Sequence, residues 1–498
     1  MVSSSISPTL LMVPLMVISR LTSLVRAAFS NILPVITGLD VLIALIPSGF
    51  GSNIDIFLLL IMIRVPGNIW KNEFFRNVAT LISGTSLAQA FSVVIYLVLS
   101  RIYTEEDFGV FGLYMNILNI TIIFSTAKYE LSILLPRSDR DSVNLLGLSG
   151  VISAGVSLLL LLLVGLLNDP ICRLLGSDEI SSWLWFIPLS TLLVGWFQSL
   201  RNYSNREKRY RLIAVANIGQ SLSNSLLKLF LGLLIVGAAG LIFGVVFGQL
   251  AGLLVFLAVQ IRVNREKAGW LRWSEMRRLA RKYSLFPRYN MWQGLINNFS
   301  GALPVFIFSS YFSTAIAGFY TFGYMILYRP VSLVANAFYQ VMFQRFVEKQ
   351  HMEVPILPEV KLFLKRSVQL LLIPFGVTAL YAPEIFSFLF GEDWTEAGRY
   401  ARIILPWIFT VSLVMPLSFI PDLYRRQRTA MIIDGVKLVL RLGALMTGVA
   451  RDNVYLGLAL YSLFSVLSIL YSLFWYLRLL KGEPPRDKTK PDIPIVHG

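Results

Sequence analysis

The sequence contains very little cysteine and histidine. Cys172 is the only cysteine among 498 residues, so no disulfide can form within the chain and no thiolate cluster can hold a metal. The two histidines, His351 and His497, lie near polar segments, which excludes catalysis by a histidine buried in a membrane. No GxxxxGK[ST] sequence is present, so there is no phosphate-cradling loop for ATP hydrolysis. The sequence thus indicates no metal and no cofactor.

Charged side chains are also scarce. They make up 14% of the chain, against about 25% in an ordinary soluble domain, while 56% of the residues are hydrophobic. This composition excludes a soluble globular or disordered protein. Lys and Arg outnumber Asp and Glu by 44 to 28. Such an excess can indicate nucleic acid binding, but here apolar runs of about 20 residues recur, so we expect no nucleic acid partner.

Twelve runs are long and apolar enough to cross a bilayer as helices, which satisfy their own backbone hydrogen bonds. They cover residues 78–100, 108–125, 143–167, 182–200, 212–236, 240–260, 289–311, 315–343, 367–389, 403–420, 429–448 and 454–477. The sequence therefore predicts an all-α polytopic membrane protein with twelve transmembrane helices.

The loops between these spans alternate in charge. One set contains 32 basic residues, whereas the other contains five, which are Arg101, Arg173, Arg399, Arg402 and Arg451. Basic loops face the cytoplasm by the positive-inside rule. Both ends of the twelve-span core are therefore predicted to be cytoplasmic.

A basic segment at residues 262–288 divides the spans into six and six. We expect lobes at residues 71–261 and 289–480, joined by this cytoplasmic linker and followed by a polar cytoplasmic tail at 481–498. Even numbers of spans make the lobes parallel repeats, related by a pseudo-two-fold axis along the membrane normal. An offset of 209 residues aligns Gly109 with Gly318 and Phe111 with Tyr320. Such repeats suggest a transporter with its site between the lobes.

Glycines repeat at four-residue spacing in the sixth span, at Gly240, Gly244, Gly248 and Gly252. This spacing puts them on one helix face, where another backbone can approach closely. The pattern favours tight packing within a lobe over a contact with substrate.

Four basic residues lie inside the predicted spans: Lys228, Arg329, Lys437 and Arg441. An ionisable residue in a span usually faces the bundle interior or an aqueous cavity. In one interpretation Asp434 neutralises Lys437 and the other cations reach toward the headgroups. In the other, all four line a cationic central cavity that binds an anionic substrate such as a phosphate or diphosphate.

Carboxylates supply a second set of candidates. Glu130 and Asp434 are candidates for carrying a coupling ion, although pairing of Glu130 with Lys128 at the interface is the favoured interpretation. A membrane glycosyltransferase with an external carboxylate base is the main enzyme alternative. However, Thr104 and Asp107 match a capping box, and the external loops are short. We therefore expect a transporter and not an enzyme.

Several local sequences resemble those of one family. The first half has Phe75-Arg76, the run from Leu99 to Phe111 (LSRIYTEEDFGVF), and Lys128-Tyr129-Glu130 before Leu135-Pro136. The second half has Phe286-Pro287-Arg288-Tyr289, Ala317-Gly318-Phe319-Tyr320 and Tyr328-Arg329-Pro330. These motifs are similar to those of Wzx-type polysaccharide flippases, in the multidrug/oligosaccharidyl-lipid/polysaccharide exporter superfamily.

The resemblance covers residues 71–481 and implies two six-helix lobes that work by alternating access. It implies translocation of undecaprenyl-diphosphate-linked oligosaccharide repeat units to the outer leaflet of the bacterial inner membrane, for O-antigen, lipopolysaccharide or exopolysaccharide. Implied partners are this lipid-linked oligosaccharide, membrane lipids, a polysaccharide polymerase and a chain-length regulator. A drug or ion-coupled exporter of the same superfamily is the alternative, but a cationic stripe disfavours a cationic drug.

Residues 1–70 precede the usual start of the family. They contain two short apolar stretches at 32–46 and 54–65. We expect a start site assigned too far upstream, and the alternative is one or two additional membrane segments.

Overall fold

The computed structural model describes residues 95–481, except residues 236, 264, 285, 352–355 and 425. The predictions for residues 1–70, for the tail at 482–498 and for most of the first span therefore lie outside the described residues. Of that span, residues 95–99 are helical. The described part of the chain is helical and contains no strand.

Eleven helices of 20 residues or more correspond to the other eleven predicted spans. They are α4 (Glu105–Ser125), α5 (Asp139–Leu175), α7 (Ile187–Arg206), α8 (Tyr210–Leu234), α9 (Ala239–Val263), α11 (Met291–Tyr311), α12 (Thr314–His351), α13 (Leu357–Phe390), α14 (Thr395–Val414), α16 (Gln427–Ala450) and α17 (Val454–Lys481). Shorter helical segments connect them: η2 (Tyr129–Leu134), α6 (Ile180–Leu184), η3 (Arg265–Trp270), α10 (Trp273–Lys282), η4 (Phe286–Asn290), η5 (Glu392–Trp394), η6 (Met415–Leu417) and α15 (Ile420–Leu423).

Seven described helical segments are long and apolar enough to cross a membrane. The long helices α8, α11, α12 and α16 are not among these seven, because polar side chains interrupt their apolar runs. Three of these helices, α8, α12 and α16, carry the four basic residues predicted inside spans, and α11 carries a group of asparagines. Low hydropathy thus marks the helices that bring polar groups into the bundle.

Several helices extend beyond their predicted spans, including the tenth. The span predicted at 403–420 begins too late, because α14 starts at Thr395 and the longer helical segment that contains it runs from Glu392 to Leu423. The first turns of α14 contain Arg399 and Arg402, which the hydropathy count assigned to a loop. At the other end the helix stops just before Pro416, which lacks a backbone N–H.

The start of α4 confirms the predicted capping box. The hydroxyl of Thr104 accepts a hydrogen bond from the backbone N–H of Asp107 at 3.3 Å. The backbone N–H of Thr104 donates in return to the Asp107 carboxylate at 3.0 Å. These carboxylates at the first turn therefore have a structural explanation, as helix N-termini favour negative charge.

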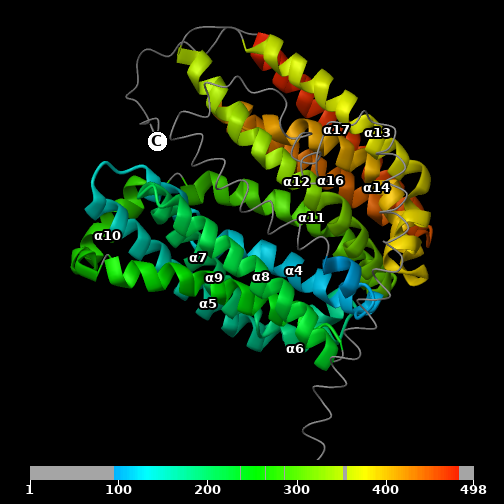
Figure 1. Cartoon of the computed structure of the whole chain (residues 1–498), viewed down its shortest axis with the longest axis horizontal. Helices are drawn as coiled ribbons and strands as arrows, with labels where there is room; N and C mark the ends of the chain where they lie inside the picture. Colours follow the sequence, from blue (N-terminus) through cyan, green and yellow to red (C-terminus); the bar gives the residue numbers. More distant parts are fainter. Residues whose placement is uncertain are drawn as a thin grey trace, which may run out of the picture.

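Two groups of helices meet at one end of the molecule and diverge toward the other (Figure 1). The first group contains α4 to α9 and the second contains α12 to α17, while α11 lies between them and packs against both α4 and α16 (Figure 1). The cytoplasmic linker predicted at 262–288 forms η3, α10 and η4 at the diverging end of the first group (Figure 1).

The two groups touch where α4 crosses α12. The Thr314 carbonyl oxygen lies 2.0 Å from the position a Cβ would take on Gly109, and the Glu105 carbonyl oxygen lies 1.8 Å from the corresponding position on Gly318. An offset of 209 residues exchanges these two contacts, as a two-fold axis between the helices requires. The predicted pseudo-two-fold relation is therefore confirmed at this crossing, which only glycine permits.

We call this the closed end of the molecule. Across it, the Trp394 indole donates a hydrogen bond to the Ser100 carbonyl at 2.9 Å. The Ser309 hydroxyl donates to the Leu175 carbonyl at 2.7 Å. Loops with few basic residues lie here, so the charge distribution predicts that the closed end is external.

The glycine face of α9 packs against α8, as predicted. A Cβ on Gly244 would lie 2.8 Å from the Asn224 carbonyl oxygen, and one on Gly248 would lie 3.0 Å from the Gln220 carbonyl oxygen. The repeat therefore serves packing within the first group.

Replacing Gly244 with alanine is expected to lower the melting temperature of the purified protein. The new methyl group forces the α8 backbone away, and overpacking of this kind costs about 1–3 kcal/mol. Gly155→Ala in α5 is the matched control, because nothing lies within 4 Å of its Cβ position. Equal melting temperatures for the two variants in a thermal shift assay would contradict the packing role.

Candidate functional site

Lys228 and Arg329 lie together on the ring of Tyr96. The Lys228 residue is 3% exposed, and its Nζ lies 4.5 Å from the Phe111 ring centroid and 5.9 Å from that of Tyr96. The Arg329 Cζ lies 5.0 Å from the Tyr96 centroid. Lys228 comes from α8 and Arg329 from α12, so this site joins the two groups of helices.

No carboxylate lies within ion-pair distance of Lys228 or Arg329 among the described residues. The Tyr96 hydroxyl is also buried and has no hydrogen-bond partner among these residues. Cation–π contacts contribute about 0.5–2 kcal/mol, whereas an unpaired buried charge costs several kcal/mol. The positive charge at this site is therefore only partly compensated, which favours an anionic ligand.

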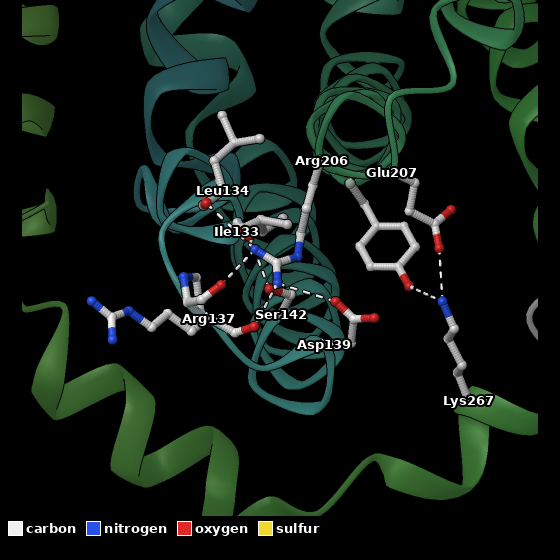
Figure 2. Close-up of polar contacts among 10 residues, drawn as sticks. Ile133, Leu134, Arg137, Asp139, Ser142, Arg206, Glu207 and Lys267 are labelled. Carbon is white, nitrogen blue, oxygen red and sulfur yellow. Dashed lines mark hydrogen bonds and ion pairs between the residues drawn. The ribbon is translucent and has the colours of Figure 1, made fainter. Parts of the chain in front are cut away.

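Arg206 at the diverging end shows the opposite arrangement. Its guanidinium donates hydrogen bonds to the carbonyls of Leu134, Pro136 and Arg137, and to the Asp139 carboxylate at 3.1 Å (Figure 2). These bonds satisfy carbonyls at the end of η2, in the manner of a basic side chain at a helix C-terminus. Arg206 is thus occupied by its own chain and is not a ligand-binding candidate.

Lys267 in η3 fixes the linker to the end of α7. Its Nζ donates to the Glu207 carboxylate at 2.8 Å and to the Tyr203 hydroxyl at 3.3 Å (Figure 2). Burial lowers the pKa of Lys267, but the bonds to Glu207 and Tyr203 raise it by more, so the net shift is upward. This cation is therefore also explained by structure.

Arg441 lies inside the second group of helices and not with Lys228 and Arg329. Its Nε donates to the Ser465 hydroxyl at 2.8 Å and its Nη1 donates to the Ser300 hydroxyl at 3.0 Å. The guanidinium also packs over Trp407 and Tyr461, with 5.1 and 5.0 Å from Cζ to the ring centroids. These neighbours satisfy hydrogen bonds but carry no negative charge.

Lys437 and Asp434 form an ion pair on α16, with 2.8 Å between Nζ and Oδ1. Asp434 also accepts a hydrogen bond from the Asn297 amide at 3.1 Å. This ion pair agrees with the first interpretation of the sequence, in which Asp434 neutralises Lys437. The structure therefore brings two of the four cations together, places a third in the second group of helices, and pairs the fourth with a carboxylate.

Glu130 is buried at the start of η2 and is 3% exposed. Its carboxylate accepts a hydrogen bond from the Thr126 hydroxyl and lies 3.9 Å from the Lys128 Nζ. The favoured pairing with Lys128 is thus present.

The double variant Asp434→Ala/Lys437→Leu is expected to retain export, because the two charges neutralise each other. Asp434→Ala alone is expected to lower the melting temperature, since it leaves the Lys437 ammonium unpaired in a partly buried position at a cost of about 1–3 kcal/mol. Export assays and thermal shifts on the single and double variants check this. Loss of export in a stable double variant would instead assign the pair to the transport route.

Reasoning from the sequence missed Tyr96 and Phe111, the aromatic partners of the cations. The sequence pattern did not indicate Asn119, Asn297 and Asn298 either, because these side chains are not ionisable. The available signal for the last two was the low hydropathy of α11. The sequence contains no signal that distinguishes Tyr96 and Phe111, because apolar spans contain many aromatic residues.

Comparisons with known proteins agree with this architecture. The model of a family described as polysaccharide biosynthesis protein matches residues 98–399, which is more than half of the chain. No curated protein matches the sequence. Among solved structures, the lipid II flippase MurJ in an inward closed conformation has a TM-score of 0.58 at 14% identity, covering 80% of this chain and 90% of its own.

The eukaryotic MATE transporter AtDTX14 has a TM-score of 0.54 at 13% identity, covering 82% of this chain and 97% of its own. At these identities the likeness shows the fold. The chain therefore has the two-lobe, all-α fold of these proteins, and its match to the polysaccharide biosynthesis family agrees with the resemblance of its motifs to polysaccharide flippases.

Proposed function

This chain belongs to the polysaccharide biosynthesis protein family, and from that premise we propose that it is a flippase for lipid-linked oligosaccharides. It translocates undecaprenyl-diphosphate-linked repeat units from the cytoplasmic to the outer leaflet of the bacterial inner membrane, with both core termini in the cytoplasm. A surface polysaccharide such as O-antigen or exopolysaccharide is the product that these units serve. The fold shared with a lipid II flippase supports this proposal.

The observation that carries the proposal is the only partly compensated positive charge of Lys228 and Arg329. A diphosphate inside a membrane needs compensating charge, because an unpaired charge there costs several kcal/mol. Two cations from opposite groups of helices supply it at one place. Arg441 adds positive charge within the second group of helices, whereas Lys437 is neutralised by Asp434.

We propose that transport uses alternating access, which the contacts at the closed end support. In this structure the two groups meet at Gly109 and Gly318 and diverge at the other end (Figure 1). A substrate from the cytoplasmic leaflet therefore enters at the diverging end. Release to the outer leaflet requires the α4–α12 crossing to open.

Glu130 is our candidate for coupling this motion to an ion, and Asp434 takes that role only if the double variant Asp434→Ala/Lys437→Leu loses export. Glu130 lies in η2, which follows the end of α4 away from the closed end, and Asp434 lies in the first half of α16. In each case the partner is a lysine, Lys128 or Lys437, which competes with a bound proton or cation.

Complementation tests the proposal directly. The gene is expressed in a bacterium that lacks its own repeat-unit flippase, and surface polysaccharide is measured together with the lipid-linked repeat unit inside the cell. We expect restored export and loss of the accumulated unit. Failure to build the unit in a deletion of this gene, in place of its accumulation, would support the glycosyltransferase alternative.

A further inference from the structure

One side chain of α4 is accessible although the helix is surrounded. Between Phe108 and Ser125, Asn119 is the only exposed residue. The helix packs against α5, α7 and α9 of the first group and against α11 and α12. Asn119 therefore lies on the part of α4 that borders α11.

Two further amides approach Asn119 from α11. The Asn298 amide donates a hydrogen bond to the Asn119 backbone carbonyl at 2.8 Å. Its neighbour Asn297 donates to Asp434 at 3.1 Å, and both asparagines are exposed. We call Asn119, Asn297 and Asn298 the amide cluster.

The amide cluster lies within the spans that the sequence predicts at 108–125 and 289–311. Asn119 is six residues before the end of α4 and Asn298 is seven residues after the start of α11, so each lies about 9–10 Å inside the helix. A side-chain amide exposed to hydrocarbon loses its hydrogen bonds with water. Three such residues at one depth therefore indicate a water-accessible region on the diverging side.

The cluster is separate from the cation site along α4. Phe111, which contacts Lys228, precedes Asn119 by eight residues, which is about 12 Å along a helix. The cations lie toward the closed end, and the amides lie toward the end where we propose that substrate enters.

The chemistry of the two sites differs. A side-chain amide has two N–H donors and a carbonyl acceptor, which match the hydroxyl and acetamido groups of a sugar. It carries no net charge, so it cannot compensate a diphosphate. The Asn119 side chain makes no hydrogen bond with the described part of the chain, so its donors and acceptor are available.

We infer that the amide cluster is the sugar-binding part of the substrate site, while Lys228 and Arg329 bind the diphosphate. This inference rests on the proposed function and extends it, because it assigns recognition of the oligosaccharide to particular residues. The lipid diphosphate then lies toward the closed end, with its sugars toward the diverging end.

Asn119→Ala provides a clean test, because the backbone carbonyl that accepts from Asn298 is retained. Purified protein is mixed with undecaprenyl diphosphate alone or with undecaprenyl diphosphate carrying the repeat unit, and binding of each lipid is measured by native mass spectrometry. We expect Asn119→Ala to weaken binding of the sugar-bearing lipid about three- to tenfold, the value of one hydrogen bond, and to leave binding of the bare lipid unchanged. We expect Asn298→Ala to weaken binding of the sugar-bearing lipid in the same way and to leave binding of the bare lipid unchanged.

Asn116→Ala is the matched control on the same helix, since the Asn116 amide donates to the Gly112 carbonyl at 2.8 Å within the helix. It is expected to bind both lipids as the wild type does. Unchanged binding of the sugar-bearing lipid by Asn119→Ala and Asn298→Ala, or an equal loss for both lipids, would overturn the assignment of sugar binding to the amide cluster. Either result would leave the proposed function standing. A wild-type protein that binds neither lipid would overturn the proposed function and this inference together.

Discussion

Replacing Lys228 with methionine is expected to stop export and, at the same time, to raise the melting temperature of the protein. Methionine keeps a long unbranched side chain but removes a charge that is buried and has no carboxylate partner among the described residues. An unpaired buried charge costs several kcal/mol, so its removal stabilises the folded state. The lost bond to a diphosphate is worth about 1.5–3 kcal/mol, or about a 10- to 150-fold loss of affinity.

Two controls separate this effect from general damage to α8. Leu226→Ala changes an exposed side chain of the same helix and is expected to leave export intact. Lys228→Arg keeps the charge and is expected to retain part of the activity. Export by Lys228→Met at the wild-type level would show that Lys228 is outside the transport route, and a lower melting temperature would show that its ammonium is compensated.

Locking the closed end with a disulfide is expected to abolish transport reversibly. The Cβ position of Gly112 lies 3.1 Å from the Cβ of Thr321, slightly closer than the usual spacing of about 3.5–4.5 Å in a disulfide. Because Cys172 is the only natural cysteine, the variant Cys172→Ser/Gly112→Cys/Thr321→Cys contains just the new pair. Oxidation joins α4 to α12, so release at this end is blocked.

The lock is measured by export or lipid translocation before oxidation, after oxidation and after treatment with a reducing agent. Each single-cysteine variant in the Cys172→Ser background is the control and should not respond to oxidant. Transport that continues after complete cross-linking would rule out opening of the α4–α12 crossing as a step of the cycle.

Hydrophobic runs predicted most of the fold because a membrane-spanning helix must be long and apolar. They did not predict the ends of the helices, which extend into water where hydropathy carries no signal. The tenth span illustrates this, since Arg399 and Arg402 continue α14 beyond its apolar part. The break at Pro416 was visible as a proline, but its effect depends on the packing of the following turn.

The candidate site was only partly predictable. Ionisable residues in apolar runs identified Lys228 and Arg329, yet their meeting on Tyr96 depends on how α8 and α12 pack. Arg441 is also an ionisable residue in an apolar run, so nothing in the sequence placed it apart from Lys228 and Arg329. Similarly, the alignment of Gly109 with Gly318 indicated a repeat, but only the structure shows that these equivalent residues pack against each other.

The most direct measurement of the central claim is translocation by the purified protein in liposomes. Undecaprenyl-diphosphate-linked repeat units are placed in both leaflets, with the same ions on both sides, and a membrane-impermeant glycosidase is added outside. The account predicts that nearly all repeat units are digested with the wild-type protein, and that digestion with Lys228→Met stops at the outer-leaflet fraction. Digestion that stops at this fraction with the wild-type protein, as in protein-free liposomes, would contradict it.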